Sequence, residues 1–302
     1  MNKASDYKIG LICVIFCQFW WGFCPIFWEA LKPMDSKIII LYRLFTMFVF
    51  SLIAARFRYS WKEIFGPLRD KKVRRKYFIA GLFLATNWSI YVWAMVTERV
   101  IQSTIGYYIE PLVICMFGVV IFKEKLTKFN IIATGFACVA VLIILVHFGQ
   151  LPATGLGLAF TWATYSAIKK TSEQPAIVSL VYETMIFGIA ALFIIIFIES
   201  RGMGGLSYHM PVKYGLLFLT GLVTVIPVGL FSVSATKIPL FMIGLIQYIS
   251  PTITFILGVF LFKEPIDQTL ITAFLIVWAG LVIYTYGQIK DERREHNEIT
   301  RQ

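Results

Sequence analysis

Three charged side chains lie inside long apolar stretches of this 302-residue sequence, and they are its first candidates for chemistry. Glu110 lies about halfway along residues 101–122 and directly precedes Pro111. Arg43 and Glu183 each follow a tyrosine, and their sequence numbers differ by 140. In a membrane, a charged group costs roughly 2.5–3.5 kcal/mol on insertion scales, so it is expected to be paired or to face a cavity. These residues are therefore candidates for binding a substrate, carrying a proton or operating a gate.

Glu110 has a functional and a structural interpretation. Desolvation favours the neutral form of a carboxyl group, which is what a proton-responsive site needs. Glu110 would then couple transport to protons or contact a cationic group of a substrate. In the structural alternative, its carboxyl group forms hydrogen bonds within a helix break at Pro111. We favour the functional interpretation.

Arg43 and Glu183 also have two interpretations. They would form a gate or a clamp for a substrate carboxylate, or else a structural ion pair, because intramembrane charges are usually paired. Each charge also has the option of backbone carbonyls or polar side chains as partners. We favour a gating or structural role over direct substrate contact. The sequence leaves open whether the two side chains touch.

Uncharged polar and aromatic residues complete the candidate site. Amide groups orient a substrate by hydrogen bonding, and aromatic rings stack on a flat or cationic substrate. Each of them also has a plainer role as a packing group or a helix–helix hydrogen bond. The predicted substrate-binding residues are Glu110, Gln247, Tyr248, Asn87, Trp21, Tyr165, Tyr107, Trp88 and Tyr91. Trp28 and Trp93 lie near the ends of apolar stretches and suit the plainer role of interface anchors or packing groups.

The elements that position these residues come from a duplicated sequence. Residues 108–124 and 248–264 match without a gap, at an offset of 140. Both begin with Tyr-Ile-x-Pro and end with Phe-Lys-Glu, and Glu110 corresponds to Ser250. Two copies of one hydrophobic unit are typical of transporters that fold from internal repeats.

The composition places the chain in a membrane. Hydrophobic residues make up 58% of it and charged residues only 15%, against about 25% charged in average soluble domains. The apolar runs are long and do not alternate, which favours helices over a β-barrel. We predict an all-α membrane protein with ten transmembrane helices. They span about 8–30, 36–57, 77–97, 101–122, 128–147, 152–170, 175–198, 213–236, 238–262 and 267–287. We expect prolines to bend the fourth and ninth, and the sixth, short and weakly polar, to be broken or to line a cavity.

Basic residues predict the orientation. With the N-terminus in the cytoplasm, 21 Lys and Arg residues fall on the cytoplasmic side and six outside. Each half then has five helices, so the two copies are inverted, with a binding site near the midplane between them. The halves are residues 8–147 and 148–290, followed by a charged cytoplasmic tail at 291–302. The basic cluster at 69–76 is expected to meet anionic headgroups.

Other classes of function find little support. We found no nucleophile-elbow, zinc-protease or Walker A motif, so we predict neither an enzyme nor an ATP-driven pump. The five cysteines and three histidines are scattered, so we expect no metal site and no cofactor. Basic residues flank the helices and form no separate domain, which argues against a nucleic-acid partner.

Several motifs together resemble a known family. These are Trp20-Trp21-Gly22-Phe23, Asn87-Trp88-Ser89-Ile90-Tyr91, residues 106–111, residues 223–227 and residues 247–251. In this order they resemble the RarD-like branch of the EamA family, within the drug/metabolite transporter superfamily. The resemblance implies ten helices, cytoplasmic termini, a central cavity and transport of small metabolites or drugs. Glu110 departs from it, since the family usually has asparagine there.

We therefore predict a secondary transporter in a bacterial cytoplasmic (inner) membrane. It would move a small metabolite, amino acid or amphipathic drug by alternating access, with proton coupling through Glu110 as one hypothesis. An uncoupled facilitator or exchanger is the main alternative, and a non-transport membrane subunit is a weaker one. The expected partners are a small-molecule substrate, protons if coupling holds, and the lipid bilayer. The sequence leaves the substrate, the direction of transport and the oligomeric state open.

Overall fold

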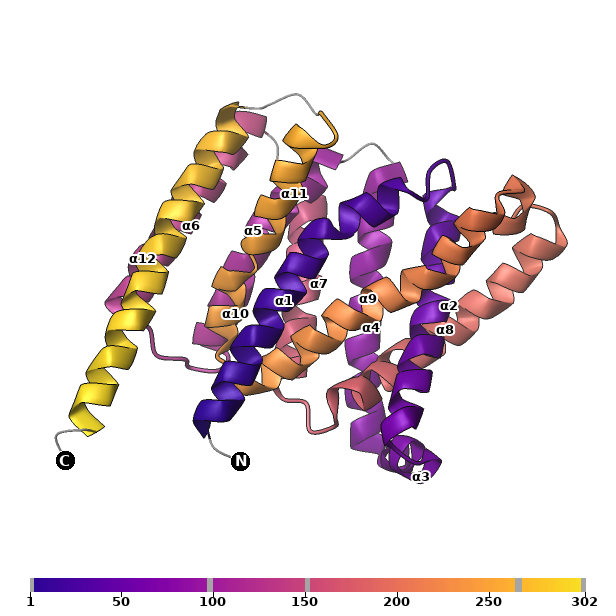
Figure 1. Cartoon of the computed structure of the whole chain (residues 1–302), viewed down its shortest axis with the longest axis horizontal. Helices are drawn as coiled ribbons and strands as arrows, with labels where there is room; N and C mark the ends of the chain where they lie inside the picture. The colour runs from indigo at the N-terminus through magenta and orange to yellow at the C-terminus, as the bar shows by residue number, and fades with distance from the viewer. Residues whose placement is uncertain (1–2, 97–99, 150–152, 264–267, 300–302) are drawn as a thin grey trace.

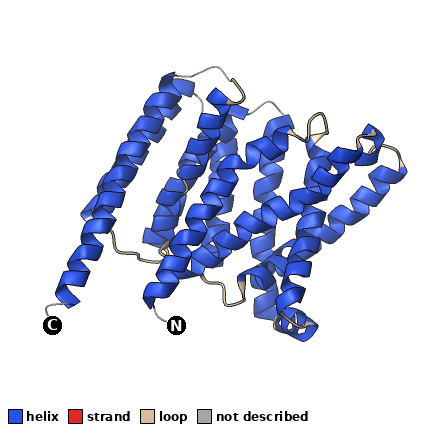
Figure 2. Ribbon diagram, viewed as in Figure 1, coloured by secondary structure: helices blue, strands red, loops and turns tan. Residues whose placement is uncertain are grey.

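The computed structural model describes residues 3–96, 100–149, 153–263 and 268–299, and in these residues it is helical with no strand (Figures 1 and 2). The α-helices are α1 (Lys3–Glu29), α2 (Ser36–Arg58), α3 (Trp61–Phe65), α4 (Lys71–Val96), α5 (Val100–Val120), α6 (Lys128–Phe148), α7 (Ala153–Lys170), α8 (Ala176–Ser200), α9 (Pro211–Lys237), α10 (Leu240–Ile246), α11 (Ile249–Phe260) and α12 (Gln268–Ile299). Two short 3₁₀-helices are η1 (Gly66–Arg69) and η2 (Gly205–Tyr208).

Among the described residues, seven helical segments are long and apolar enough to cross a membrane. They are α1, α2, α6, α8, α9, α10 with α11, and residues 268–287 of α12. In α5, residues 105–120 form a shorter apolar helix. The fold is therefore a multi-pass helical membrane protein. The predicted third and sixth spans are the helices α4 and α7, which are not among these seven segments. The first begins with six residues of which five are Lys or Arg, and the second carries Thr, Ser and Lys.

The helix boundaries repeat with the offset seen in the sequence. The helices α2, α4, α5 and α6 begin at residues 36, 71, 100 and 128, while α8, α9, α10 and α12 begin at 176, 211, 240 and 268. Each pair of starts differs by 140 in sequence number. Lys123 and Lys263, which differ by the same offset, both have a positive φ, at 53° and 56°. The duplication is therefore structural. Glu264, the last residue of the second Phe-Lys-Glu turn, lies outside the described residues, as do residues 300–302 of the predicted tail.

The two repeated turns lie at opposite ends of the bundle (Figure 1). The turn after α5 lies at the end where α1 begins and α12 ends, and the turn after α11 lies at the other end. The basic segment with α3, η1 and the start of α4 lies at the same end as the turn after α5. The turn after α5 and the equivalent turn after α11 therefore lie at opposite ends of the bundle.

The predicted ninth span is interrupted, as its proline suggested. The helix α10 ends at Ile246, and α11 starts at Ile249 after a turn at Gln247 and Tyr248. Proline has no N–H, so Pro251 cannot bond to the carbonyl of Gln247 four residues earlier. The N–H of Ser250 donates to the Gln247 carbonyl instead, at 3.3 Å. The fourth span behaves differently, because α5 runs on as one helix through Pro111. The sixth span, α7, is also unbroken.

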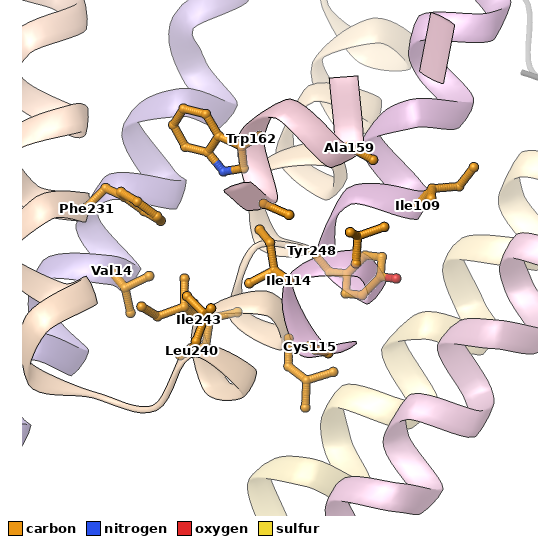
Figure 3. Close-up of a cluster of buried hydrophobic side chains, with 14 of the residues drawn as sticks. Val14, Ile109, Ile114, Cys115, Ala159, Trp162, Phe231, Leu240, Ile243 and Tyr248 are labelled. Atoms are coloured by element: carbon orange, nitrogen blue, oxygen red, sulfur yellow. The ribbon is translucent and has the colours of Figure 1, made fainter. Parts of the chain in front are cut away.

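The core joins segments from both halves of the chain. Figure 3 shows Val14 of α1, Ile114 of α5, Trp162 of α7 and Phe231 of α9 in one cluster with residues of α10. Helices in lipid gain little from the hydrophobic effect, so close packing of small residues matters more. At Gly221 of α9, a Cβ would lie 2.3 Å from the backbone of Thr46 in α2. The Gly221 N–H also donates to the Thr46 hydroxyl at 3.0 Å.

We therefore expect Gly221→Ala to lower the thermal midpoint of the detergent-solubilised protein, because the added methyl group pushes α9 away from α2. Overpacking of this kind costs about 1–3 kcal/mol. Gly215 is the matched control on the same helix, since a Cβ there meets nothing within 4 Å. Equal midpoints for Gly221→Ala and Gly215→Ala, measured by thermal unfolding, would contradict the close helix contact.

Candidate functional site

Arg43 of α2 is the centre of an aromatic cluster. Its guanidinium carbon lies 4.5 Å from the ring centre of Trp88, 5.1 Å from that of Trp28 and 5.8 Å from that of Trp21. These rings come from α4 and α1, so three helices meet at this cation. Such contacts contribute roughly 0.5–2 kcal/mol each when water is excluded. Arg43 is only 8% exposed, so water stabilises its charge little, and the faces of these rings stabilise it instead.

The polar partners of Arg43 leave much of its bonding capacity unused. A guanidinium carries five N–H donors, and here Nε–H donates to the Thr224 hydroxyl of α9 at 2.9 Å. That is its only hydrogen bond to a residue that the structure describes. None of the ion pairs between described residues includes Arg43. The guanidinium therefore has N–H donors left for a planar anion, which it would hold through two parallel bonds.

Three further predicted residues extend this cluster along α4 and α5. Arg43 interacts electrostatically with the hydroxyl groups of Tyr91 and Tyr107. The two tyrosine rings are 6.3 Å apart, and Tyr107 is 39% exposed. Glu110 is partly exposed one turn further along α5 and interacts electrostatically with Tyr107. Its carboxyl group makes no hydrogen bond or ion pair with any described residue. We call Trp21, Trp28, Arg43, Trp88, Tyr91, Tyr107, Glu110 and Thr224 the Arg43 cluster.

Glu183 pairs with Lys169, which answers the question of its partner that the sequence left open. Its Oε1 lies 2.7 Å from the Lys169 ammonium, and both side chains are fully buried. Its Oε2 accepts a hydrogen bond of 2.9 Å from the Tyr165 hydroxyl. The Lys169 ammonium also donates to the Ser179 hydroxyl at 2.5 Å. This buried network satisfies the Glu183 carboxylate without Arg43, so Arg43 and Glu183 do not form an ion pair.

Sequence reasoning missed Lys169 because it counted the residue as a flanking cytoplasmic charge at the end of a span. The available signal was Glu183 itself, since a carboxylate inside the bundle needs a nearby cation. Trp28, near the end of its apolar stretch, packs on Arg43. Trp93 is within α4, but its side chain lies outside what the structure describes.

The remaining predicted residues make contacts between helices. The Asn87 amide donates to the Leu158 carbonyl and the Thr161 hydroxyl of α7, both at 2.9 Å. The Tyr248 hydroxyl donates to the carbonyl of Tyr108 at 3.0 Å. Gln247 is 5% exposed, and its Oε1 has no partner among the described groups. The structure therefore brings together Trp21, Arg43, Trp88, Tyr91, Tyr107 and Glu110, and it engages Asn87, Tyr165 and Tyr248 elsewhere.

A second polar cluster ties the helix ends together where α10 begins. The Glu124 carboxylate accepts bonds from the backbone N–H groups of Leu240 at 2.7 Å and Phe241 at 2.8 Å. Lys170, at the end of α7, lies 3.8 Å from the same carboxylate and donates to the carbonyl of Ile238. Acidic groups stabilise the positive end of a helix dipole. The first Phe-Lys-Glu turn thus connects the two halves at this end.

Comparisons with known proteins identify the family of this chain. The sequence pattern of the EamA-like transporter family matches residues 8–146 and again residues 152–286. An uncharacterised transporter, YojE of Bacillus subtilis, is 32% identical over 96% of this chain and 98% of its own. The protein RarD of Streptomyces exfoliatus is 33% identical over 99% and 95%, and RarD of Escherichia coli is 26% identical over 96% and 98%. A crystal structure covering 94% of this chain has a TM-score of 0.71 at 15% identity, which shows likeness of fold alone.

We expect Lys169→Met and Glu183→Leu each to destabilise the protein by about 3–5 kcal/mol, because each leaves one buried charge uncompensated. The double variant should recover much of that loss, since it removes both charges. Thermal unfolding in detergent measures the three variants, with Lys62→Met on the exposed surface as the control. A double variant that is as unstable as the sum of the single ones would show that the two side chains act independently.

Proposed function

The chain belongs to the EamA-like transporter family, and from that premise we propose that it is a secondary transporter for a small solute bearing a carboxylate. The solute would be a metabolite or an amino acid, and the mechanism alternating access across the cytoplasmic membrane. Its bacterial relatives are named as transporters or as RarD proteins. Transport and membrane location follow from the family and the apolar helices, whereas the substrate class rests on the Arg43 cluster.

One observation supports this substrate class above the others. The Arg43 guanidinium is buried between helices of both family repeats, with the Thr224 hydroxyl as its only described hydrogen-bond partner. An unpaired cation in low dielectric attracts an anion strongly. The surrounding indole rings exclude water and offer flat faces to an organic group. A carboxylate at the guanidinium, with the rest of the solute against Trp21, Trp88 and Tyr107, fits this chemistry. A cationic drug fits less well, because Arg43 would repel it.

We also propose the ten-helix plan with two inverted five-helix halves and both termini in the cytoplasm. The constant offset of 140 between equivalent helix starts supports it, as do the equivalent turns at opposite ends of the bundle (Figure 1). The orientation is supported by the basic residues, which gather at the end that contains α3 and the start of α4. In this plan α10 and α11 together make one span, and the halves correspond to residues 8–147 and 148–290.

In alternating access the two halves rock about the site and expose it to one side at a time. The contacts at the start of α10 are suited to holding the cytoplasmic end closed. Glu124 joins the turn after α5 to α10, and Lys237 at the end of α9 pairs with Asp6 of α1. These contacts lie at helix ends and are polar, so they can be exchanged for water when that end opens.

Glu110 is the proposed proton-coupling residue. It is partly exposed beside Tyr107 and has no described hydrogen-bond or ion-pair partner, so a proton would change its charge without breaking a structural bond. A neutral Glu110 presents no charge to an anionic solute bound beside Tyr107, whereas an ionised Glu110 would repel it. Protonation would therefore favour binding of an anionic solute, and deprotonation its release.

Transport assays in vesicles of the purified protein test the substrate class. A panel of organic acids, amino acids, nucleosides and amphipathic drugs is screened by counterflow. For the acids that exchange, we expect Arg43→Gln to weaken binding by roughly 10- to 100-fold, the value of a charge-assisted hydrogen-bond pair. Arg43→Lys should retain part of the binding, because it keeps the charge but loses the planar fork.

Arg56 provides the matched control, because it is an exposed arginine on the same helix and packs on the Trp61 ring, away from the cluster. Arg56→Gln should bind the acids as the parent does. Equal affinity of the parent and Arg43→Gln for all acids would rule out Arg43 as the carboxylate ligand. A folded protein that exchanges nothing in the panel would favour the non-transport interpretation.

The coupling hypothesis is tested by Glu110→Gln, which keeps the shape of the side chain but cannot ionise. We expect this variant to lose uphill accumulation driven by a pH gradient and the pH dependence of binding, while counterflow persists. Glu173→Gln, at a carboxylate outside the cluster, is the control. Unchanged pH dependence in Glu110→Gln would support a facilitator or exchanger that needs no proton.

A further inference from the structure

Two hollows lie along the seam between α4 and α8. One has a volume of about 440 Å³ and is lined by Leu68, Lys71, Arg74, Arg75, Phe78, Tyr182, Met185 and Ile186. The other, of about 420 Å³, is lined by Leu82, Ala85, Thr86, Ser89 and Ile90 of α4, Phe187 of α8 and Leu44 of α2. Phe78 and Leu82 are one turn apart on α4, and Ile186 and Phe187 are adjacent on α8. The two hollows therefore adjoin and follow one direction along the helices.

The first hollow has a cationic rim. Lys71, Arg74 and Arg75 lie in the first two turns of α4, and their side chains are exposed. The Arg74 Nη1 donates to the Leu68 carbonyl at 3.4 Å, and both residues line the hollow. Among the residues that the structure describes, no acidic one lines it. The nearby Asp70 carboxylate accepts a hydrogen bond from the backbone N–H of Lys72 at 2.8 Å and so satisfies a backbone donor at the start of α4. The positive end of the α4 dipole adds to the field.

The rest of the seam is apolar. Phe78 and Leu82 are 42% and 43% exposed, and Ile186 is 47% exposed. Phe78, Leu82, Ala85 and Ser89 follow one another by three or four residues, so they form one stripe on α4. The Ser89 hydroxyl donates to its own helix at the Ala85 carbonyl, 2.8 Å away, so it adds no free polar group to the stripe. A cationic rim thus lies next to an apolar hollow, an arrangement that suits a phosphate with an acyl chain.

We propose that the α4–α8 seam binds one anionic phospholipid, with its phosphate at Lys71, Arg74 and Arg75 and an acyl chain along Phe78, Leu82 and Ala85. The rim lies at the end of the bundle with α3, where basic residues gather, and a leaflet places its phosphates at that level. The apolar hollow continues toward the middle of the bundle, where acyl chains lie. Scattered surface cations explain headgroup attraction in general, but they do not explain an apolar hollow that continues from this rim.

Native mass spectrometry of the full-length chain in detergent tests the proposal with phosphatidylglycerol and phosphatidylcholine of equal chain length. We expect one phosphatidylglycerol to bind tightly and phosphatidylcholine to bind much more weakly. Replacing Lys71, Arg74 and Arg75 together by glutamine should weaken the binding of phosphatidylglycerol by roughly 100-fold, at about 1 kcal/mol for each cation near a lipid surface. The matched control replaces Lys62, Arg69 and Lys72, three exposed cations of the same region that do not line the hollow.

A second variant tests the acyl-chain channel. Ala85→Trp fills the apolar hollow, so it should weaken the binding of long-chain phosphatidylglycerol but leave the binding of the short-chain dihexanoyl lipid unchanged. Glycerol phosphate without acyl chains should not compete, whereas competition by it would assign the rim to a free phosphate compound. Equal losses in the two triple variants, or equal binding of both lipids, would overturn the proposal. These readouts measure lipid binding, so they hold whether or not the transport proposal survives.

Discussion

A charge inside hydrocarbon must be compensated by the protein, and the arrangement around Arg43 and Glu183 follows from that constraint. Glu183 is satisfied within the second half, by the Lys169 ammonium at 2.7 Å and the Tyr165 hydroxyl at 2.9 Å. Arg43 is instead surrounded by three indole rings and donates one hydrogen bond to the Thr224 hydroxyl of the other half. Complete compensation makes Glu183 a structural group, whereas partial compensation leaves Arg43 with N–H donors that a ligand can use.

The two charges occupy equivalent positions in the repeats, so the difference between them is informative. Both stand at the same distance from the start of their helix, and α2 packs closely against α8. Duplication therefore kept the backbone plan while the side chains around each position diverged. Glu110 and Ser250 show the same divergence at another equivalent pair. A solute has no twofold symmetry of its own, so a polar site between the two repeats would use this asymmetry.

Close helix contacts and helix breaks set where these groups stand. Glycines at helix crossings, such as Gly221 against Thr46, let backbones approach to distances that a side chain forbids. Pro251 removes one backbone donor and the chain turns at Gln247 and Tyr248, whereas α5 runs through the equivalent Pro111 without a break. The Tyr248 hydroxyl then reaches the Tyr108 carbonyl of the other half. Proline by itself therefore does not decide whether a helix breaks; the contacts around it contribute.

The amino-acid sequence alone predicts the family, the helical membrane class, the internal duplication with its constant offset and most helix boundaries. These depend on local patterns: apolar length, repeated motifs and prolines that interrupt a hydrogen-bond ladder. It also singled out Arg43, Glu110 and the aromatics around them. The folded structure was needed to show that Glu183 pairs with Lys169, that Trp28 packs on Arg43, and that Asn87 and Tyr248 form hydrogen bonds between helices. Those partners come from different helices, and a periodic apolar pattern says how far a helix runs but not which neighbour its faces meet.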